Sequence, residues 1–121
     1  MKMKTVAVIG ASSQRHKFGN KAVRGFQRQG YKVVPINPHE AQIEGLEAFP
    51  SVLDVPVGID IATLYLPPHE GLAVLDEIAK KKIPELWINP GAESGEVIRR
   101  ARELNLDPII ACSLLAIGEM P

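Results

Sequence analysis

The residues best suited to chemistry in this sequence form a polar stretch that follows its first apolar run. That run ends at Gly10, whose freedom of backbone conformation permits a tight turn. Ser12 follows, and Arg15 and Lys17 bring two cations before Gly19 opens a helical pattern. Backbone N–H groups, a helix N-terminus and nearby cations together suit phosphate. We therefore predict a phosphate site here, in preference to a plain strand-to-helix turn with solvated cations.

Polar or rigid residues also follow the later apolar runs of the chain. The loops after these runs begin at Asn37, Leu66, Asn89 and Cys112. Ligands of open parallel sheets bind outside the carboxyl ends of the strands, at the point where the strand order reverses. We therefore expect these loops to surround one site together with the first loop.

The elements that position these loops can be read from the apolar runs, which are typical of strands buried on both faces of a parallel sheet. The runs cover residues 5–10, 31–36, 59–66, 85–88 and 108–111. Most are separated by helical patterns, and this alternation predicts parallel strands with right-handed crossovers. The predicted fold is α/β, a Rossmann-like doubly wound three-layer sandwich whose five-stranded parallel sheet has the order 3-2-1-4-5.

Residues typical of helix ends bound three helical patterns. Gly30 fits a left-handed C-terminus after the first, and the lysines at 80–82 suit the negative end of the second helix dipole. Ser94 is the predicted N-cap of the third, which Asn105 ends. Residues 39–58 are less regular and suggest a short strand or turn and one helical turn.

Length and composition exclude several classes of protein. The 121 residues fit one domain over 1–121, and Lys plus Arg equals Asp plus Glu at 14 each. The net charge near zero argues against a nucleic-acid-binding protein. The early apolar stretch, residues 6–9, is too short for a signal peptide or a membrane span. The single cysteine, Cys112, permits no internal disulfide and fits a cytoplasmic location.

The first loop departs from the fingerprint of NAD sites. That fingerprint is G-x-G-x-x-G, with an acid about 20 residues later at the tip of the second strand that binds a ribose hydroxyl. Here Ser12 stands two residues after Gly10, and Glu40 lies beyond Pro38, in the loop. A dinucleotide with a free ribose diol is therefore disfavoured, whereas the charges suit a phosphorylated nucleotide.

Three segments in series resemble a known family. They are VAVIGAS at 6–12, GYKVVPINP at 30–38 and FPSVLDVP at 49–56. In this order and spacing the chain is similar, over essentially its whole length, to the stand-alone CoA-binding domain proteins and to the amino-terminal domain of the succinyl-CoA synthetase α-subunit. The resemblance implies a five-stranded Rossmann-like fold that binds coenzyme A, free or as an acyl-CoA, across the carboxyl edge of the sheet.

The same resemblance implies which residues bind the cofactor. Residues 10–13 would wrap the phosphates, Arg15 and Lys17 would supply charge, and Asn37 and Pro38 would flank the adenosine. Two further strand-end motifs would also contact CoA. The full set is Gly10, Ala11, Ser12, Ser13, Arg15, Lys17, Asn37, Pro38, Tyr65, Leu66, Pro67, Pro68, Ile88, Asn89 and Pro90.

The sequence departs from the synthetases in ways that bear on this site. The synthetases carry a further domain with a phosphorylated histidine, for which this sequence has no counterpart, and their first loop has more glycine. The basic residue that follows their second strand is also missing here, where His39 or Glu40 occupies the region. The resemblance therefore leaves open how the 3′-phosphate would be held.

Other reactive side chains have competing interpretations. His16, His39 and His69 lie in strand-end loops, where they could serve acid–base chemistry or contact phosphate, but histidines beside a binding cleft are the simpler interpretation. Their spacing does not suit a metal site. Cys112 could form a mixed disulfide with CoA, and a buried structural cysteine is the alternative.

These observations favour a module that binds CoA or an acyl-CoA, with no catalysis of its own and without nucleic acid or membrane contact. Three alternatives remain open. The chain could be a subunit of a split CoA ligase that needs a protein partner, or an NAD(P)-linked oxidoreductase module. It could also be a protein–protein interaction module whose cleft is vestigial.

Overall fold

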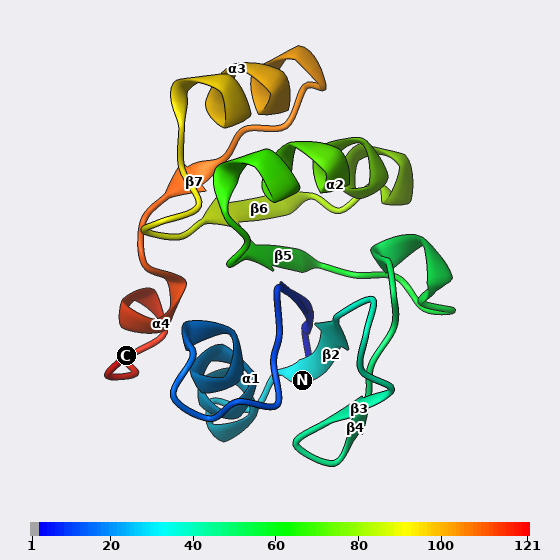
Figure 1. Ribbon diagram of the computed structural model, residues 1–121, viewed down its shortest axis with the longest axis vertical. Coiled ribbons are helices and arrows are strands. Elements are labelled where there is room, and N and C mark those ends of the chain that lie inside the picture. Colours follow the sequence, from blue (N-terminus) through cyan, green and yellow to red (C-terminus); the bar gives the residue numbers. More distant parts are fainter. Residues whose placement is uncertain (1–2) are drawn as a thin grey trace.

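The computed structural model describes residues 3–121 and contains a parallel sheet flanked by helices (Figure 1). Residues 1 and 2, which precede the first predicted strand, lie outside the described residues. The main sheet contains five parallel strands: β1 (Thr5–Ile9), β2 (Lys32–Ile36), β5 (Ile61–Leu64), β6 (Glu85–Ile88) and β7 (Ile109–Ile110). The helices are α1 (Phe18–Arg28), α2 (Pro68–Lys81), α3 (Gly95–Glu103) and α4 (Ser113–Ala116). The predicted Rossmann-like α/β class is confirmed.

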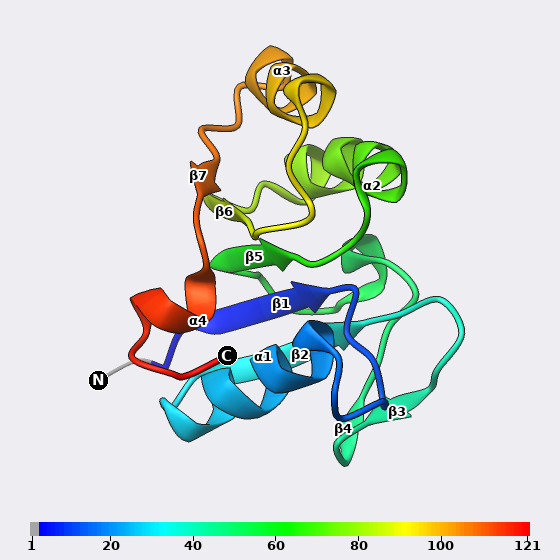
Figure 2. The same cartoon turned by 60° about the vertical axis from the view of Figure 1, so that its left-hand side comes forward.

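Both faces of the sheet are covered by helices. Figures 1 and 2 show α2 and α3 on one side and α1 and α4 on the other. Ile9 and Leu64 pack with Leu75 of α2 in one core, whereas Val8 packs with Phe26 of α1 in the other. Because helices cover both faces of the sheet at β1, all residues of this strand are buried. This explains why the strand forms a continuous apolar run in the sequence.

The predicted strand order is wrong. Numbered along the chain, the five main strands lie in the order 2-1-3-4-5, with β5 beside β1 and not beside β2. The predicted order 3-2-1-4-5 would have placed β6 beside β1. The site therefore has a different neighbour from the one expected, because the loop after β5 adjoins the loop after β1.

The segment between β2 and β5 explains the observed order. It forms a hairpin of β3 (Gln42–Ile43) and β4 (Leu46–Glu47), then the 3₁₀ turn η1 (Val52–Asp54). Phe49 bridges to Ile36, and its N–H donates to Pro35 O at 3.0 Å. The outer edge of β2 is thus partly occupied where a third strand would pair. The chain instead returns beside β1, where Asp60 Oδ2 accepts from the N–H of Thr5 at 2.8 Å.

The predicted helix ends agree with the structure. Gly30 has a left-handed φ of 88° after α1, and Asn105 has a φ of 62° after α3. Ser94 caps α3 by accepting from the N–H of Val97 at 3.0 Å. None of the helices described between residues 3 and 121 has the length and apolarity needed to cross a membrane.

Candidate ligand-binding site

A cavity of about 730 Å³ lies at the carboxyl ends of β1, β2 and β5, a size usual for small-molecule sites. It sits where the strand order reverses, because the chain leaves β1 toward β2 on one side and β5 joins β1 on the other. Most of the residues singled out in the sequence line it: Gly10, Ala11, Ser12, Lys17, Asn37, Pro38, Tyr65, Leu66 and Pro67.

Side-chain amides hold the loop after β1 by its carbonyl groups. Asn20, which is fully buried in α1, donates to Ser12 O at 2.8 Å. Asn37, which follows β2, donates to Ala11 O at 2.8 Å. Gly10 opens the loop with a φ of 94°, a conformation that favours glycine. The two amides thus hold the loop by hydrogen bonds to its carbonyl oxygens and occupy none of its N–H groups.

The start of α1 offers such donors to the cavity. Phe18 and Gly19 both line it, and the structure gives their N–H groups no hydrogen bond within residues 3–121. The side chain of Lys17, the N-cap residue, does not cap the helix. Unpaired N–H groups at the positive end of a helix dipole attract anions. This end of the cavity therefore suits a phosphate group.

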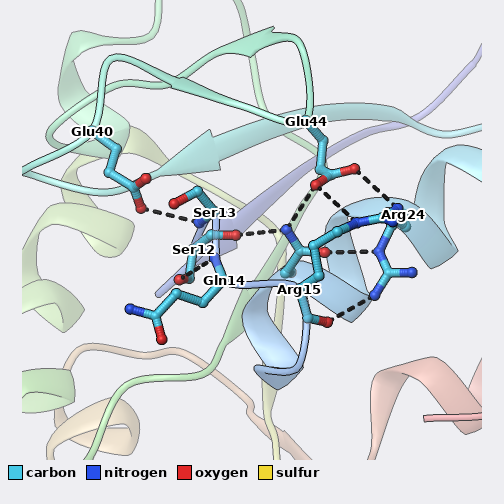
Figure 3. Close-up of polar contacts among 8 residues, drawn as sticks. Ser12, Ser13, Gln14, Arg15, Arg24, Glu40 and Glu44 are labelled. Atoms are coloured by element: carbon cyan, nitrogen blue, oxygen red, sulfur yellow. Dashed lines mark hydrogen bonds and ion pairs between the residues drawn. The ribbon is translucent and has the colours of Figure 1, made fainter.

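The two predicted cations differ in availability. Arg15 Nε lies 3.4 Å from Glu44 Oε2 (Figure 3). Arg15 does not line the cavity. Glu44 also accepts from Asn20, and this bond is the main reason that the pKa of the Glu44 carboxyl is lowered, ahead of the charges of Arg15 and Arg24. Lys17 lines the cavity and forms no ion pair within the described part of the chain. Lys17 is therefore the cation available to a ligand there.

A second carboxylate contacts the loop after β1. Glu40 Oε2 accepts from the N–H of Ser13 at 3.1 Å (Figure 3) and from Asn37 Nδ2 at 3.3 Å. Hydrogen bonding by Ser13 lowers the pKa of the Glu40 carboxyl, and the charge of Lys17 adds a smaller contribution. The N–H of Ser13 is thus already bonded to a carboxylate of the chain itself.

Helix α2 supplies a wall that the sequence analysis missed. Glu70, Ala73, Val74 and Glu77 line the cavity. They recur at helical spacing beside the buried stripe that contains Leu75. That spacing could have identified them, had β5 been placed next to β1.

The motif after β6 lies away from the cavity. Ile88, Asn89 and Pro90 do not line it, because β5 separates β6 from β1. The amide of Asn89 is instead buried in a polar network, where it donates to Thr63 Oγ1 at 2.7 Å and accepts from the N–H of Ser113 at 2.9 Å.

This network reaches the cavity through Tyr65. The Tyr65 hydroxyl lies 2.9 Å from Ser113 Oγ, and burial raises the pKa of the Tyr65 phenol. Tyr65 also lines the cavity. Its hydrogen bond to Ser113 therefore holds the Tyr65 side chain, which forms part of one cavity wall, in place.

The remaining candidates lie outside the cavity lining, apart from one histidine. His39 lines the cavity, whereas His16 and His69 are exposed and are not part of the lining. Cys112 is half-buried beside the core under α1 and is not part of the lining. Ser13, Arg15 and Pro68 also lie outside the lining.

Comparison with known proteins yields a match over nearly the whole chain. Residues 4–118 match the family model described as "CoA binding domain". A conserved hypothetical protein of Pyrococcus furiosus has a solved structure with a TM-score of 0.85 and 30% identity, covering 95% of this chain and 99% of that one.

Parts of two ADP-forming acetate–CoA ligases are also similar to this chain. The chain is 34% identical over 109 residues to "Acetate--CoA ligase [ADP-forming] II" of Archaeoglobus fulgidus, covering 84% of this chain and 16% of that protein. It is 33% identical over 98 residues to the α-subunit of the corresponding P. furiosus enzyme, covering 78% of this chain and 21% of that subunit. The chain thus spans a small part of these ligases.

Proposed function

This chain belongs to the family of CoA-binding domains, and we propose that it binds coenzyme A or an acyl-CoA in the cavity at the ends of β1, β2 and β5. The observation that carries the proposal is the start of α1, whose first N–H groups have no hydrogen-bond partner within residues 3–121 and lie beside Lys17 on the wall of that cavity, an arrangement that suits an anion.

The polarity of the cavity supports an orientation for the ligand. The N–H groups of α1 and the Lys17 ammonium suit the pyrophosphate of CoA. The opposite wall, on α2, carries Glu70 and Glu77 with Val74 between them, and its carboxylates disfavour phosphate. The uncharged pantetheine arm is therefore expected to lie toward α2, and the adenosine toward Asn37.

The proposal predicts that CoA stabilises the protein against heat. A ligand at 100 times its dissociation constant adds about 2.7 kcal/mol, which is about 10 °C in melting temperature for a domain of this size. Thermal unfolding with CoA, dephospho-CoA, NAD and ATP at equal concentration tests this. Stabilisation by either CoA nucleotide but not by NAD supports the proposal. Stabilisation by NAD alone overturns it in favour of a redox module, and no effect at all favours the interaction module.

Two neighbouring cations provide a test of the anion site. Lys17→Ala is expected to weaken CoA binding about tenfold, because Lys17 is free to pair with phosphate. Arg15→Ala is the matched control, with an effect of about threefold or less, because Glu44 already pairs with Arg15 outside the cavity. Calorimetric titration of both variants measures the difference. A larger loss of CoA affinity in Arg15→Ala than in Lys17→Ala would mean that the phosphate binds on the side of the loop where Arg15 lies.

The relatives favour a second candidate function, the CoA-binding part of an ADP-forming ligase whose other domains lie on another chain. The test is to mix this chain with a P. furiosus ligase α-subunit that lacks its matching region. Restored CoA-dependent ligase activity would support this role. Absence of activity from a mixture in which both chains are folded would count against it.

A further inference from the structure

A second, smaller cavity lies on the face of the sheet that α1 and α4 cover (Figures 1 and 2). Its volume is about 160 Å³, and it shares no lining residue with the candidate ligand-binding site. It reaches the amino ends of two strands, because Ile61 and Glu85 are the first residues of β5 and β6. The residues that line it are Phe26, Tyr31, Ile61, Glu85, Trp87, Ser113, Ala116 and Ile117.

Aromatic rings form a large part of this lining. The single tryptophan of the chain lines the cavity together with one of its two tyrosines and one of its three phenylalanines. The rings of Phe26 and Tyr31 lie 5.0 Å apart at an angle of 80°. Aromatic rings attract cations to their electron-rich faces, most strongly when the cation is withdrawn from water. The lining therefore suits an organic cation.

One carboxylate lines the same cavity. Glu85 and Trp87 lie two residues apart on β6 and so face the same side of the sheet, where Trp87 Nε1 donates to Glu85 Oε2 at 2.8 Å. Within residues 3–121 the structure gives Glu85 Oε1 no hydrogen-bond partner, and none of the ion pairs there includes Glu85. The half-buried Glu85 side chain thus retains an acceptor, with no cation of the described chain beside it.

The chemistry of the lining selects among possible ligand groups. Glu85 would repel an anion, and a purely apolar group would cover Glu85 Oε1 without bonding to it. An alkylammonium group avoids both costs, because its N–H groups can donate to Oε1 while its methylene groups pack on Ile61 and Ile117. The volume is below the ~300–1,000 Å³ usual for whole small-molecule ligands, so the cavity suits one short amine or the end of one side chain.

We propose that this second cavity binds an alkylammonium group, with Glu85 as its counter-ion and the rings of Trp87 and Tyr31 beside it. A small primary amine and the side chain of a lysine on a partner protein offer this same chemistry. The inference does not rest on the proposed CoA function, because the two cavities have no residue in common.

Trp87 reports on this cavity directly, because it is the only tryptophan in the sequence and lines the cavity. The wild-type protein, without CoA, is titrated with n-butylammonium chloride at constant ionic strength while Trp87 fluorescence and its indole N–H resonance are followed. A saturable change with a Kd of about 10 mM or tighter is expected. The same titration with 1-butanol, which has the same carbon chain and no charge, should show binding at least about tenfold weaker.

Two variants test the role of the carboxylate. Glu85→Gln keeps a side-chain oxygen that can accept from Trp87 and is expected to weaken butylammonium binding about tenfold. Glu47→Gln, an exposed acid on β4 with the same loss of charge, is the matched control and should leave the Kd within about twofold. Melting temperatures of both variants establish that they are folded.

Three outcomes would overturn the inference: no saturable change at Trp87, equal binding of butanol and butylammonium by the wild-type protein, or an unchanged Kd in folded Glu85→Gln. The wild-type titrations decide the matter even if that variant does not fold. A capped lysine, N-acetyl-lysine methylamide, separates the two sources. Binding as tight as that of butylammonium supports a lysine side chain of a partner, and binding of butylammonium alone supports a free amine.

Discussion

Gly19→Ala is expected to lower the free energy of unfolding by about 3 kcal/mol or more and the melting temperature by about 10 °C or more. A Cβ on Gly19 would clash with Gly10 O and lie 3.2 Å from Ala11 Cα, both of which are backbone atoms. Neither atom can rotate away, so α1 must move off the loop after β1. Thermal and denaturant unfolding measure the loss.

The same change should weaken CoA binding in the protein that remains folded. The N–H groups of Phe18 and Gly19 lie at the start of α1, so moving the helix moves the proposed phosphate donors. Gly95→Ala is the matched control, because Gly95 also opens a helix and a Cβ there meets nothing within 4 Å. That variant should be neutral or slightly more stable. Equal stability of the two variants would mean that α1 does not pack on the loop as described.

Much of the fold could be predicted because it depends on local pattern. Buried parallel strands produce apolar runs, and helix ends require particular residues, as Ser94 and Gly30 illustrate. Strand order depends instead on long-range pairing. The bridge of Phe49 to Ile36 at the edge of β2 involves no periodic pattern, so no local pattern indicated that β5 would lie beside β1.

The candidate site could be predicted from the sequence to the extent that the residues lining the cavity directly follow strands. The loop after β1 could be assigned to the cavity without knowing the place of β5, because β1 adjoins the point where the strand order reverses in both the predicted and the observed order. The α2 wall of the cavity and the position of residues 88–90 outside the cavity lining both follow from the observed strand order. The contact between Glu40 and Ser13 could not be predicted either, because it depends on the turn that Asn37 makes with His39.

Asn89→Leu is expected to cost about 3 kcal/mol or more, because it removes the centre of a buried polar network at nearly constant volume. The Asn89 side chain donates to Leu64 O at 3.0 Å and accepts from the N–H of Ser113, which is itself buried. Leucine would leave the buried N–H of Ser113 unpaired, at about 1–3 kcal/mol. It would also remove the side-chain hydrogen bonds to Thr63 Oγ1 and Leu64 O, at about 1 kcal/mol each, although the backbone N–H of residue 89 still donates to Leu64 O. Thr63→Val, which removes one hydroxyl of the same network, should cost about 1 kcal/mol.

The effect of Asn89→Leu on binding decides what role Asn89 has. The residue lies behind the cavity and reaches it through Ser113 and Tyr65. The folded variant should therefore bind CoA within about threefold of the wild-type affinity, with the main loss in stability. The family resemblance implied the opposite, a direct contact with CoA. A variant of unchanged melting temperature that binds CoA at least tenfold more weakly would establish that contact, and would mean that the ligand extends past β5 to the end of β6.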